Sequence, residues 1–276
     1  MPPGRDDASD AERVQCHDPS LRRHGVSEPR SSGMKITWVG HATVLLETAT
    51  ARLITDPVLR GRVAHLRRQV PPAADPGIVD GVLLSHLHHD HFDKPSLRRL
   101  VSPKTTALLP TGATKFLAGI PFGTVREVRV GETLEISGTA VHVVEAWHDG
   151  RRRPGPASPQ HDTLGYVVDG VWFAGDTDLN DGMRDLRGEV DVALIPIWGW
   201  GPSLGPGHLD PEGAARAIAL VQPRIAIPIH WGTFLPYGVR RGELLIKPPR
   251  EFLRHMGELA PSTRVEMLAP GDSLTL

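Results

Sequence analysis

Short runs of apolar residues, many of them β-branched, follow one another from Met34 to the end of the chain. Such runs, punctuated by Gly, Pro, Asn and Asp, are typical of β-strands. The run 80–86 is apolar at the consecutive positions 82–84, which predicts a strand buried on both faces. The full pattern predicts strands at 35–39, 43–48, 51–55, 80–86, 105–110, 124–130, 140–147, 163–168, 171–177, 190–198 and 224–231.

Other segments carry the start signals or the spacing of helices, namely 95–101, 114–120, 179–187, 211–222 and 249–259. The clearest is 211–222, because Asp210 can cap it, Pro211 fits the first turn, and Ala, Ile and Leu recur on one face. Strands come first in meanders and later alternate with helices. This order predicts an α/β fold in which helices cover sheets.

The N-terminal segment 1–33 is polar, charged and rich in Pro, Ser and Gly. It has too little apolar surface to offset the entropy of ordering, so we expect a disordered tail at 1–33 and one domain at 34–276. The tail lacks the apolar stretch of a signal peptide, and no run of 18 apolar residues occurs. We therefore expect a cytoplasmic protein without a transmembrane segment; the pattern leaves the oligomeric state undetermined.

The charge and the cysteine content of the chain limit the substrates and the metal ligands that it can use. The chain has 31 basic and 32 acidic residues, so no global field attracts nucleic acid, and a nucleic-acid substrate is not expected. Cys16 is the single cysteine, which excludes an intrachain disulfide framework and thiolate-rich metal sites. Any metal must be held by nitrogen and oxygen ligands.

The strand at 80–86 leads into the segment SHLHHDH, which holds four histidines and an aspartate within six positions. If the backbone stays extended, His86 and His88 point to the same side and His89 points away, because side chains alternate along a strand. A turn toward the next helix then presents Asp90 and His91. Imidazole and carboxylate donors gathered in this way are typical of zinc sites. Three of the four histidines are expected to bind metal, and His89 is not.

Further donors lie downstream in similar positions. His148, Asp176 and His230 each follow an apolar strand, at the edge of a sheet where functional groups usually gather. Taken singly, each could be a hydrogen-bonded turn residue. Their coincidence with the histidine cluster favours one shared metal site.

The series His86-x-His88-x-Asp90-His91, then His148, Asp176 and His230, resembles the ligand series of the metallo-β-lactamase superfamily. The segments TWVGHATVLLE, LITDP, FAGDTD, HLDPEGA and IHWGTF resemble one branch of it more narrowly. That branch includes N-acyl-phosphatidylethanolamine phospholipase D and L-ascorbate-6-phosphate lactonase-like proteins. The resemblance spans about residues 34 to 276 and implies an αββα sandwich.

The resemblance also implies two divalent metal ions. The first would be held by His86, His88 and His148, the second by Asp90, His91 and His230, and Asp176 would bridge them. Two ions that share a carboxylate can share a hydroxide that attacks the substrate at neutral pH. An imidazole at position 88 favours zinc and hydrolysis, with Mn²⁺ or Fe²⁺ as alternatives.

Other residues match supporting positions of the branch. Asp56 is expected behind the ligands, where a carboxylate orients an imidazole, and His41 is expected nearby. His208 is a candidate proton donor to the leaving group, beside Asp90 as a catalytic group that orients the hydroxide. The arginines after His148 (Arg151, Arg152 and Arg153) are candidates for binding an anionic group of a small or lipid-like substrate. Trp147, Trp198, Trp200 and Trp231 are expected either to form an apolar substrate wall or to pack in the core.

The predicted function is therefore a binuclear metal-dependent hydrolase acting on a phosphodiester. The alternatives are a lactonase acting on a phosphorylated or neutral lactone and, more remotely, a non-catalytic metal-binding module. The segment GPSLG (201–205) matches a serine-hydrolase motif, but Pro206 and Gly207 prevent the helix that the motif requires after Ser203. A serine mechanism is therefore not expected.

Overall fold

A computed structural model of the chain describes residues 33–70, 75–152, 158–239 and 242–276, and every count below refers to these residues. Two seven-stranded sheets form the centre of the molecule. The first has the order β17-β1-β2-β3-β6-β7-β8 and the second β16-β14-β13-β12-β11-β10-β9, and a small third sheet has the order β15-β5-β4.

The strands of the first sheet are β1 (Lys35–Gly40), β2 (Thr43–Glu47), β3 (Arg52–Thr55), β6 (Gly81–Leu83), β7 (Thr106–Pro110), β8 (Thr124–Val128) and β17 (Ser273–Thr275). Those of the second are β9 (Thr133–Ile136), β10 (Thr139–Glu145), β11 (Leu164–Val168), β12 (Val171–Phe173), β13 (Val192–Pro196), β14 (Ile225–Ile229) and β16 (Arg264–Val265). The third sheet consists of β4 (Arg62–Val63), β5 (Leu66–Arg68) and β15 (Phe234–Pro236). The helices are α1 (Lys94–Leu100), α2 (Pro211–Val221), α3 (Glu243–Leu259) and the short 3₁₀ helices η1 (Thr114–Leu117) and η2 (Asp181–Leu186).

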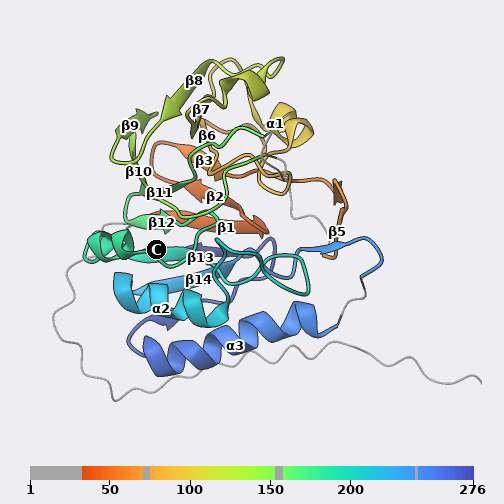
Figure 1. Cartoon of the computed structure of the whole chain (residues 1–276). Helices are drawn as coiled ribbons and strands as arrows, with labels where there is room; N and C mark the ends of the chain where they lie inside the picture. The colour runs from red at the N-terminus through yellow and green to blue at the C-terminus, as the bar shows by residue number, and fades with distance from the viewer. Residues whose placement is uncertain (1–32, 71–74, 153–157, 240–241) are drawn as a thin grey trace, which may run out of the picture.

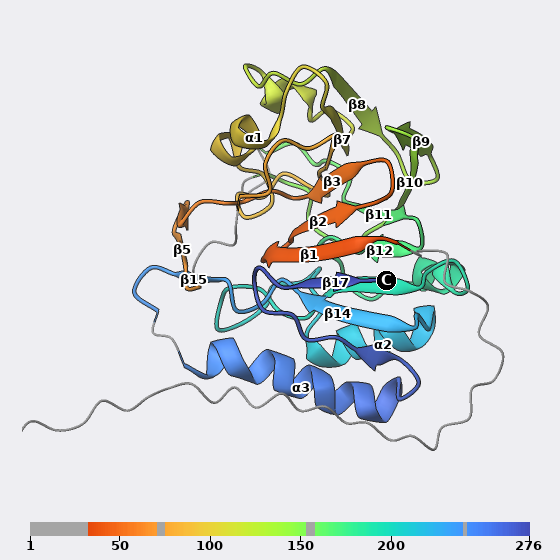
Figure 2. The same cartoon turned by 180° about the vertical axis from the view of Figure 1, so that it is seen from behind.

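The elements stack in four layers (Figures 1 and 2), with α1 on the outer face of the first sheet and α2 and α3 on the outer face of the second. The alternating directions of the side chains along β6 explain why layers cover both faces of the first sheet. Leu83 packs in the cluster between the two sheets, whereas Val82 and Leu84 pack in the cluster under α1. Apolar side chains thus cover both faces of this strand, as its sequence predicts. The predicted αββα sandwich is confirmed.

The predicted strands of the two large sheets are all present, with ends that differ by a few residues. The short strands β4, β5, β9, β15, β16 and β17 were not predicted, because two to four residues carry too little periodicity. The segments 114–120 and 179–187 form only 3₁₀ turns, η1 and η2, instead of full helices. Helix α3 starts at Glu243, six residues before the predicted start, because it continues through Pro248 and Pro249, whose side chains are buried.

Helix α2 begins as predicted. Pro211 lies in its first turn, and the Asp210 carboxylate accepts a hydrogen bond of 2.7 Å from the Gly213 amide. Its buried face, which includes Ala214 and Ile218, packs in the cluster beneath the second sheet. The predicted tail lies almost wholly outside the described residues. None of the described helices is long and apolar enough to cross a membrane.

We expect Asp210→Ala to lower the free energy of unfolding by about 1 kcal/mol, because the first turn of α2 loses its side-chain cap. Urea denaturation followed by circular dichroism measures this loss. Asp185→Ala, which changes an exposed aspartate of η2, is the matched control and should change stability by less than about 0.5 kcal/mol. Equal effects of the two substitutions would show that the cap does not stabilise α2.

Candidate metal centre

The predicted site residues converge at one edge of the sandwich because the strands that precede them run in the same direction. In the first sheet β1 and β3 are both antiparallel to β2, and β3 is parallel to β6. In the second sheet β10 and β12 are both antiparallel to β11, and β12, β13 and β14 are parallel. The loops that follow these strands therefore open at the same edge, where functional groups of such sheets usually gather.

Unusual backbone conformations turn several of these loops toward the centre. His41, Asp56 and His230 all have positive φ, at 56°, 33° and 64°. Residues other than glycine rarely adopt this conformation, and it concentrates at functional sites that the surrounding packing holds in place. Gly175 also has positive φ (64°), and a Cβ there would lie 2.8 Å from the Leu164 carbonyl oxygen. Only glycine fits immediately before Asp176.

Three histidines form the first donor set. The distance between His86 Nε2 and His88 Nδ1 is 3.0 Å, and His148 Nε2 also lies 3.0 Å from His88 Nδ1. His86 and His88 come from the loop after β6, whereas His148 follows β10 in the other sheet. The structure thus brings together the three residues that the sequence assigns to one metal. The side chain of His89 is exposed, and it belongs to none of the donor groups found in the described residues.

Asp90, His91 and His230 form the second donor set. The Nε2 atoms of His91 and His230 are 3.0 Å apart, and each lies 3.8 Å from Asp90 Oδ2. His41, which sequence reasoning placed near the site, joins this set: its Nε2 donates to Asp90 Oδ2 over 2.9 Å, and its ring lies on His230 with 3.8 Å between centroids. All four side chains are buried.

Asp176 adjoins residues of both sets. Its Oδ2 lies 3.2 Å from His91 Nε2, and its Oδ1 lies 3.2 Å from His230 Nε2. It also groups with His148 and His208 as a possible set of metal donors. Its Oδ1 is buried and accepts no hydrogen bond from the described residues.

The outer nitrogens of these rings have fixed partners. His148 Nδ1 donates to the Gly207 carbonyl (2.8 Å), and His230 Nδ1 donates to the Trp198 carbonyl (2.7 Å). A carbonyl oxygen can only accept, so the proton of each neutral ring lies on Nδ1 and the Nε2 lone pair faces the centre. Such outer partners orient metal-binding imidazoles and select their tautomer.

Asp56 supports two ligands at once. Its Oδ2 lies 2.7 Å from His91 Nδ1 and accepts a hydrogen bond from the Ser85 hydroxyl, while its Oδ1 accepts from the Ser85 amide. The same hydroxyl lies 2.9 Å from His86 Nδ1. One buried carboxylate therefore orients a ring of each donor set. Sequence reasoning anticipated Asp56 behind the ligands but missed Ser85, although its position directly before His86 was a signal.

The protonation of the site follows from burial and neighbouring charges. Burial lowers the pKa of His148 to about 4 and that of His230 to about 3. Burial also lowers the pKa of His91, but the carboxylates of Asp176 and Asp90 outweigh it and raise that pKa well above its usual value. Burial raises the pKa of Asp176 and Asp90, but the nearby histidines outweigh it and hold both well below the usual range.

The donor set fits divalent metal ions. The inward lone pair on His230 Nε2 lies 3.2 Å from the bare Oδ1 of Asp176, and this contact is repulsive unless a cation lies between the two atoms. Nitrogen and oxygen donors without thiolates suit Zn²⁺, Mn²⁺ or Fe²⁺. The donors fall into groups of three or four residues whose ligand atoms lie within 4.8 Å of one another.

A single loop, residues 198–208, contacts ligands of both sets. The carbonyl groups of Trp198 and Gly207 hold His230 and His148, as described above. Trp200 Nε1 donates to Asp90 Oδ2 over 3.0 Å, and His208 Nε2 lies 3.5 Å from Asp176 Oδ2. The backbone partners had no side-chain signal in the sequence, and sequence reasoning missed them.

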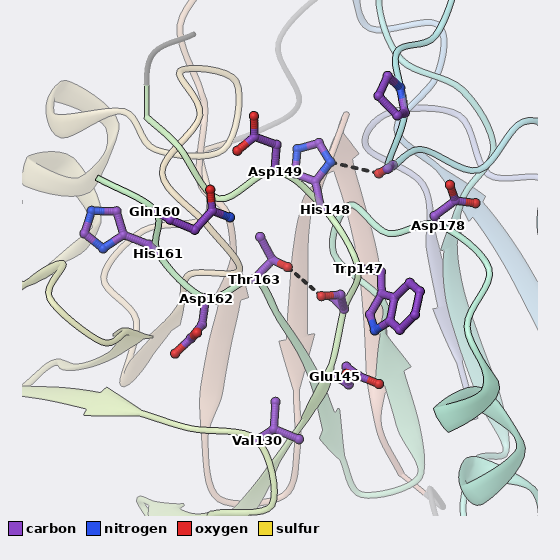
Figure 3. A pocket seen from close by; sticks show the side chains of 13 residues that line it. Val130, Glu145, Trp147, His148, Asp149, Gln160, His161, Asp162, Thr163 and Asp178 are labelled. Carbon is purple, nitrogen blue, oxygen red and sulfur yellow. Dashed lines mark hydrogen bonds between the residues drawn. The ribbon is translucent and has the colours of Figure 1, made fainter. Parts of the chain in front are cut away.

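The tryptophans serve different purposes. Trp200 was expected either at a substrate wall or in the core, and its indole N–H donates to Asp90, a predicted metal ligand. Trp231 packs against Trp38 in the core, with 5.5 Å between ring centroids. Trp147 is 55% exposed, and it lines a groove of about 590 Å³ beside His148. Glu145, Asp149, Asp162 and Asp178 give this groove an acidic rim (Figure 3).

The arginines after His148, which were expected to bind an anionic group of the substrate, contact other residues of the protein. Arg152 Nη1 donates to the Leu87 carbonyl over 2.9 Å, and its guanidinium packs over Phe92 and Phe116. Arg151 interacts with the Asp149 carboxylate at 3.3 Å. The Arg152 contacts brace the loop that carries His88, whereas the Arg151 contact lies within the loop after His148. Arg153 lies outside the described residues. The role of these arginines in substrate binding stays a prediction.

The sandwich and its paired donor sets define a metal-dependent hydrolase of the metallo-β-lactamase class. Residues 51–231 match the family model described as "Beta-lactamase superfamily domain". The chain belongs to this superfamily.

Relatives agree with this assignment. A UPF0173 metal-dependent hydrolase of Methanopyrus kandleri is 33% identical over 87% of this chain and 99% of its own. The N-acyl-phosphatidylethanolamine-hydrolyzing phospholipase D 1 of Caenorhabditis elegans is 31% identical over 82% of this chain and 70% of its own. The structure of Igni18, a metallo hydrolase from Ignicoccus hospitalis, shares the fold with a TM-score of 0.64 and 21% identity, over 89% of this chain and 99% of its own.

Acid should destabilise the metal-free protein through His148. An unfolded histidine takes up a proton near pH 6.5, whereas native His148 does so only near pH 4, so between these values the unfolded state binds more protons. Stability should therefore fall as the pH falls from about 6.5 to 4, by up to about 3 kcal/mol from this residue. Urea unfolding of metal-free wild type and His148→Asn at several pH values measures the difference. A difference that does not vary with pH would contradict the burial of a neutral ring.

Proposed function

We propose that the protein is a binuclear hydrolase that cleaves a phosphodiester, with two divalent ions, foremost Zn²⁺ with Mn²⁺ or Fe²⁺ as alternatives. His86, His88 and His148 would hold one ion, and Asp90, His91 and His230 the other. Asp176 would bridge them. The observation that carries the proposal is the buried Oδ1 of Asp176, which accepts no hydrogen bond from the described residues and faces the inward lone pair of His230.

When bound, two such ions lower the pKa of a coordinated water and polarise the phosphoryl oxygen. Asp90 is placed to orient the attacking water. Its Oδ2 accepts hydrogen bonds from His41 Nε2 and Trp200 Nε1, and neither bond uses Oδ1. The two donors thus fix the plane of the carboxylate while Oδ1 can accept a proton from the water.

His208 is placed to supply a proton to the leaving oxygen. Its Nδ1 donates to the Gly205 carbonyl over 3.1 Å, which directs Nε2 toward Asp176, and the proton given to the leaving oxygen is the Nε2 proton of the imidazolium form. The side chain is 24% exposed, so its Nε2 can reach both the cluster and an entering substrate. A general acid in this position typically accelerates departure of a poor leaving group by 10²- to 10⁴-fold.

The phosphodiester assignment is supported by one relative. The Caenorhabditis elegans protein is named a phospholipase D, an enzyme class that cleaves a phosphodiester bond. It shares 31% identity with this chain. Lactones are the competing substrate class. Comparing the turnover of a phosphodiester with that of a lactone decides between the two classes.

Metal content tests the two-ion centre. Wild type reconstituted with Zn²⁺ or Mn²⁺ should bind two equivalents, whereas Asp176→Ala should bind at most one and lose more than about a hundredfold in turnover, because both sites lose a ligand. His89→Ala is the matched control in the same loop and should retain both ions and activity. Elemental analysis that finds less than one equivalent in reconstituted wild type would refute the binuclear model.

A substrate panel tests the reaction. The holoenzyme should hydrolyse bis(p-nitrophenyl) phosphate and an alkyl p-nitrophenyl or dialkyl phosphodiester faster than a neutral lactone. His208→Gln should lower kcat about 10²- to 10⁴-fold for the dialkyl substrate, whose alkoxide needs a proton, and only slightly for p-nitrophenolate departure. Faster turnover of the lactone would replace the phosphodiester assignment. No turnover of any substrate by fully loaded protein would favour a non-catalytic metal-binding module.

A further inference from the structure

The β4–β5 hairpin carries two arginines that face each other. Arg62 pairs with Arg67 in the register of the two strands, and both side chains are exposed. Residues directly opposite in an antiparallel pair have closely spaced Cβ atoms, and like charges there are destabilising. A hairpin of this length has few other interactions to compensate for such repulsion.

Within the described parts of the chain, neither guanidinium forms an ion pair with a carboxylate. By contrast Arg60, just before the hairpin, forms a 2.6 Å ion pair with Asp93. The next residue of β5, Arg68, is 7% exposed and donates to the Val39 and Val58 carbonyls. Three guanidinium groups thus lie on two short strands without a neutralising carboxylate among these residues.

An aromatic ring and a recess accompany the exposed pair. The Arg62 guanidinium lies over the Tyr237 ring at 5.0 Å, and Tyr237 is 65% exposed. Arg67 and Tyr237 line a recess of about 290 Å³ together with Gln69, Pro236 and Val239. The stacking holds Arg62 in one orientation, which reduces the entropy that an incoming ligand must overcome.

The hairpin adjoins the metal centre on the Asp90 side. His65 in its turn contacts the Trp200 ring edge to face, with 4.8 Å between centroids, and Trp200 donates to Asp90. The Tyr237 amide donates to the His65 carbonyl over 2.9 Å, which ties the recess to the same turn. In Figure 2, β5 and β15 lie side by side at one side of the molecule.

The other side of the centre has the opposite charge. The groove beside His148 is lined by four carboxylates, of which Asp149 interacts with Arg151, and no lysine or arginine is among its lining residues (Figure 3). An anionic substituent on a bound substrate is repelled there and attracted toward the hairpin.

We propose that Arg62 and Arg67 bind a phosphate group of the substrate that is separate from the scissile bond, on the Asp90 side of the centre. Guanidinium groups bind phosphate oxygens bidentately, and two of them in register can share one dianion. This rests on the proposed function, because it extends the phosphodiester assignment to a substrate with a second, terminal phosphate. The headgroups of anionic lipids carry the same phosphate group, so the experiment must distinguish a substrate phosphate from a membrane surface.

The test compares matched substrates and matched variants. p-Nitrophenyl hydroxyalkyl phosphodiesters with linkers of increasing length are prepared with and without a phosphate on the terminal hydroxyl. In wild-type holoenzyme, the terminal phosphate should raise kcat/KM about tenfold at the best linker length, through KM. Arg62→Gln/Arg67→Gln should lose this preference and keep kcat for the unphosphorylated substrate within about twofold.

Arg126→Gln/Arg129→Gln removes the same charge from exposed arginines in and after β8 and should keep the preference. Unfolding curves of both double variants confirm that each is folded. An equal loss in the two variants would overturn the proposal, because it would reflect net charge alone. No preference for the terminal phosphate in wild type at any linker length would overturn it as well.

Two binding measurements separate this proposal from the function on which it rests. Calorimetric titration of the holoenzyme with glycerol 3-phosphate should show about tenfold weaker binding in the hairpin variant than in the β8 variant, even if no phosphodiester is turned over. If the holoenzyme turns over no phosphodiester but the two variants still differ in their binding of glycerol 3-phosphate, only the proposed function is refuted. Sedimentation with phosphatidic acid vesicles covers the lipid source. A loss of vesicle binding without any change toward glycerol 3-phosphate would assign the arginines to a membrane surface and overturn the substrate site.

Discussion

The metal centre depends on electrostatic repulsion that the protein holds in place. Imidazole nitrogens and carboxylate oxygens point at one another across about 3 Å in a buried space. Where two unprotonated atoms meet, as His230 Nε2 and Asp176 Oδ1 do, the contact is unfavourable without a cation, and it persists because the outer edges of the rings are bound elsewhere. Carbonyl groups of the 198–208 loop hold His148 and His230, and Asp56 with Ser85 holds His86 and His91. The same repulsion therefore favours metal binding and lowers the stability of the metal-free protein.

Residues of both sheets hold the donors in place against this repulsion. His230 in the second sheet donates its amide to the carbonyl of His41 in the first, and both residues have a left-handed backbone. The core between the sheets fixes this contact, and rotation of one sheet against the other would pull each donor set apart, because each set takes residues from both sheets. The surroundings are also asymmetric, since carboxylates line the groove beside one set and the exposed Arg62 and Arg67 lie on the side of the other.

Much of this follows from local sequence. Apolar, β-branched runs predict the strands of both large sheets, and Asp210 predicts the start of α2. The donors could be anticipated because His86, His148 and Asp176 each follow such a run, and parallel strands deliver their following loops to one edge. Where two principles compete, as in α3, local reasoning fails: proline disfavours a helix, but the buried Pro248 and its neighbour are accommodated within it.

The sequence by itself thus determined the strands, the class of fold and the chemistry of the donor set, because periodicity and residue type act over a few positions. Tertiary structure alone decided which groups support the donors. Gly207 contributes a carbonyl, which every residue has, and so leaves no signal in the sequence. Trp200 and Arg152 could face substrate or protein, and only packing shows that both bind the protein. The pairing of Arg62 with Arg67 depends on the register of strands too short to show a period.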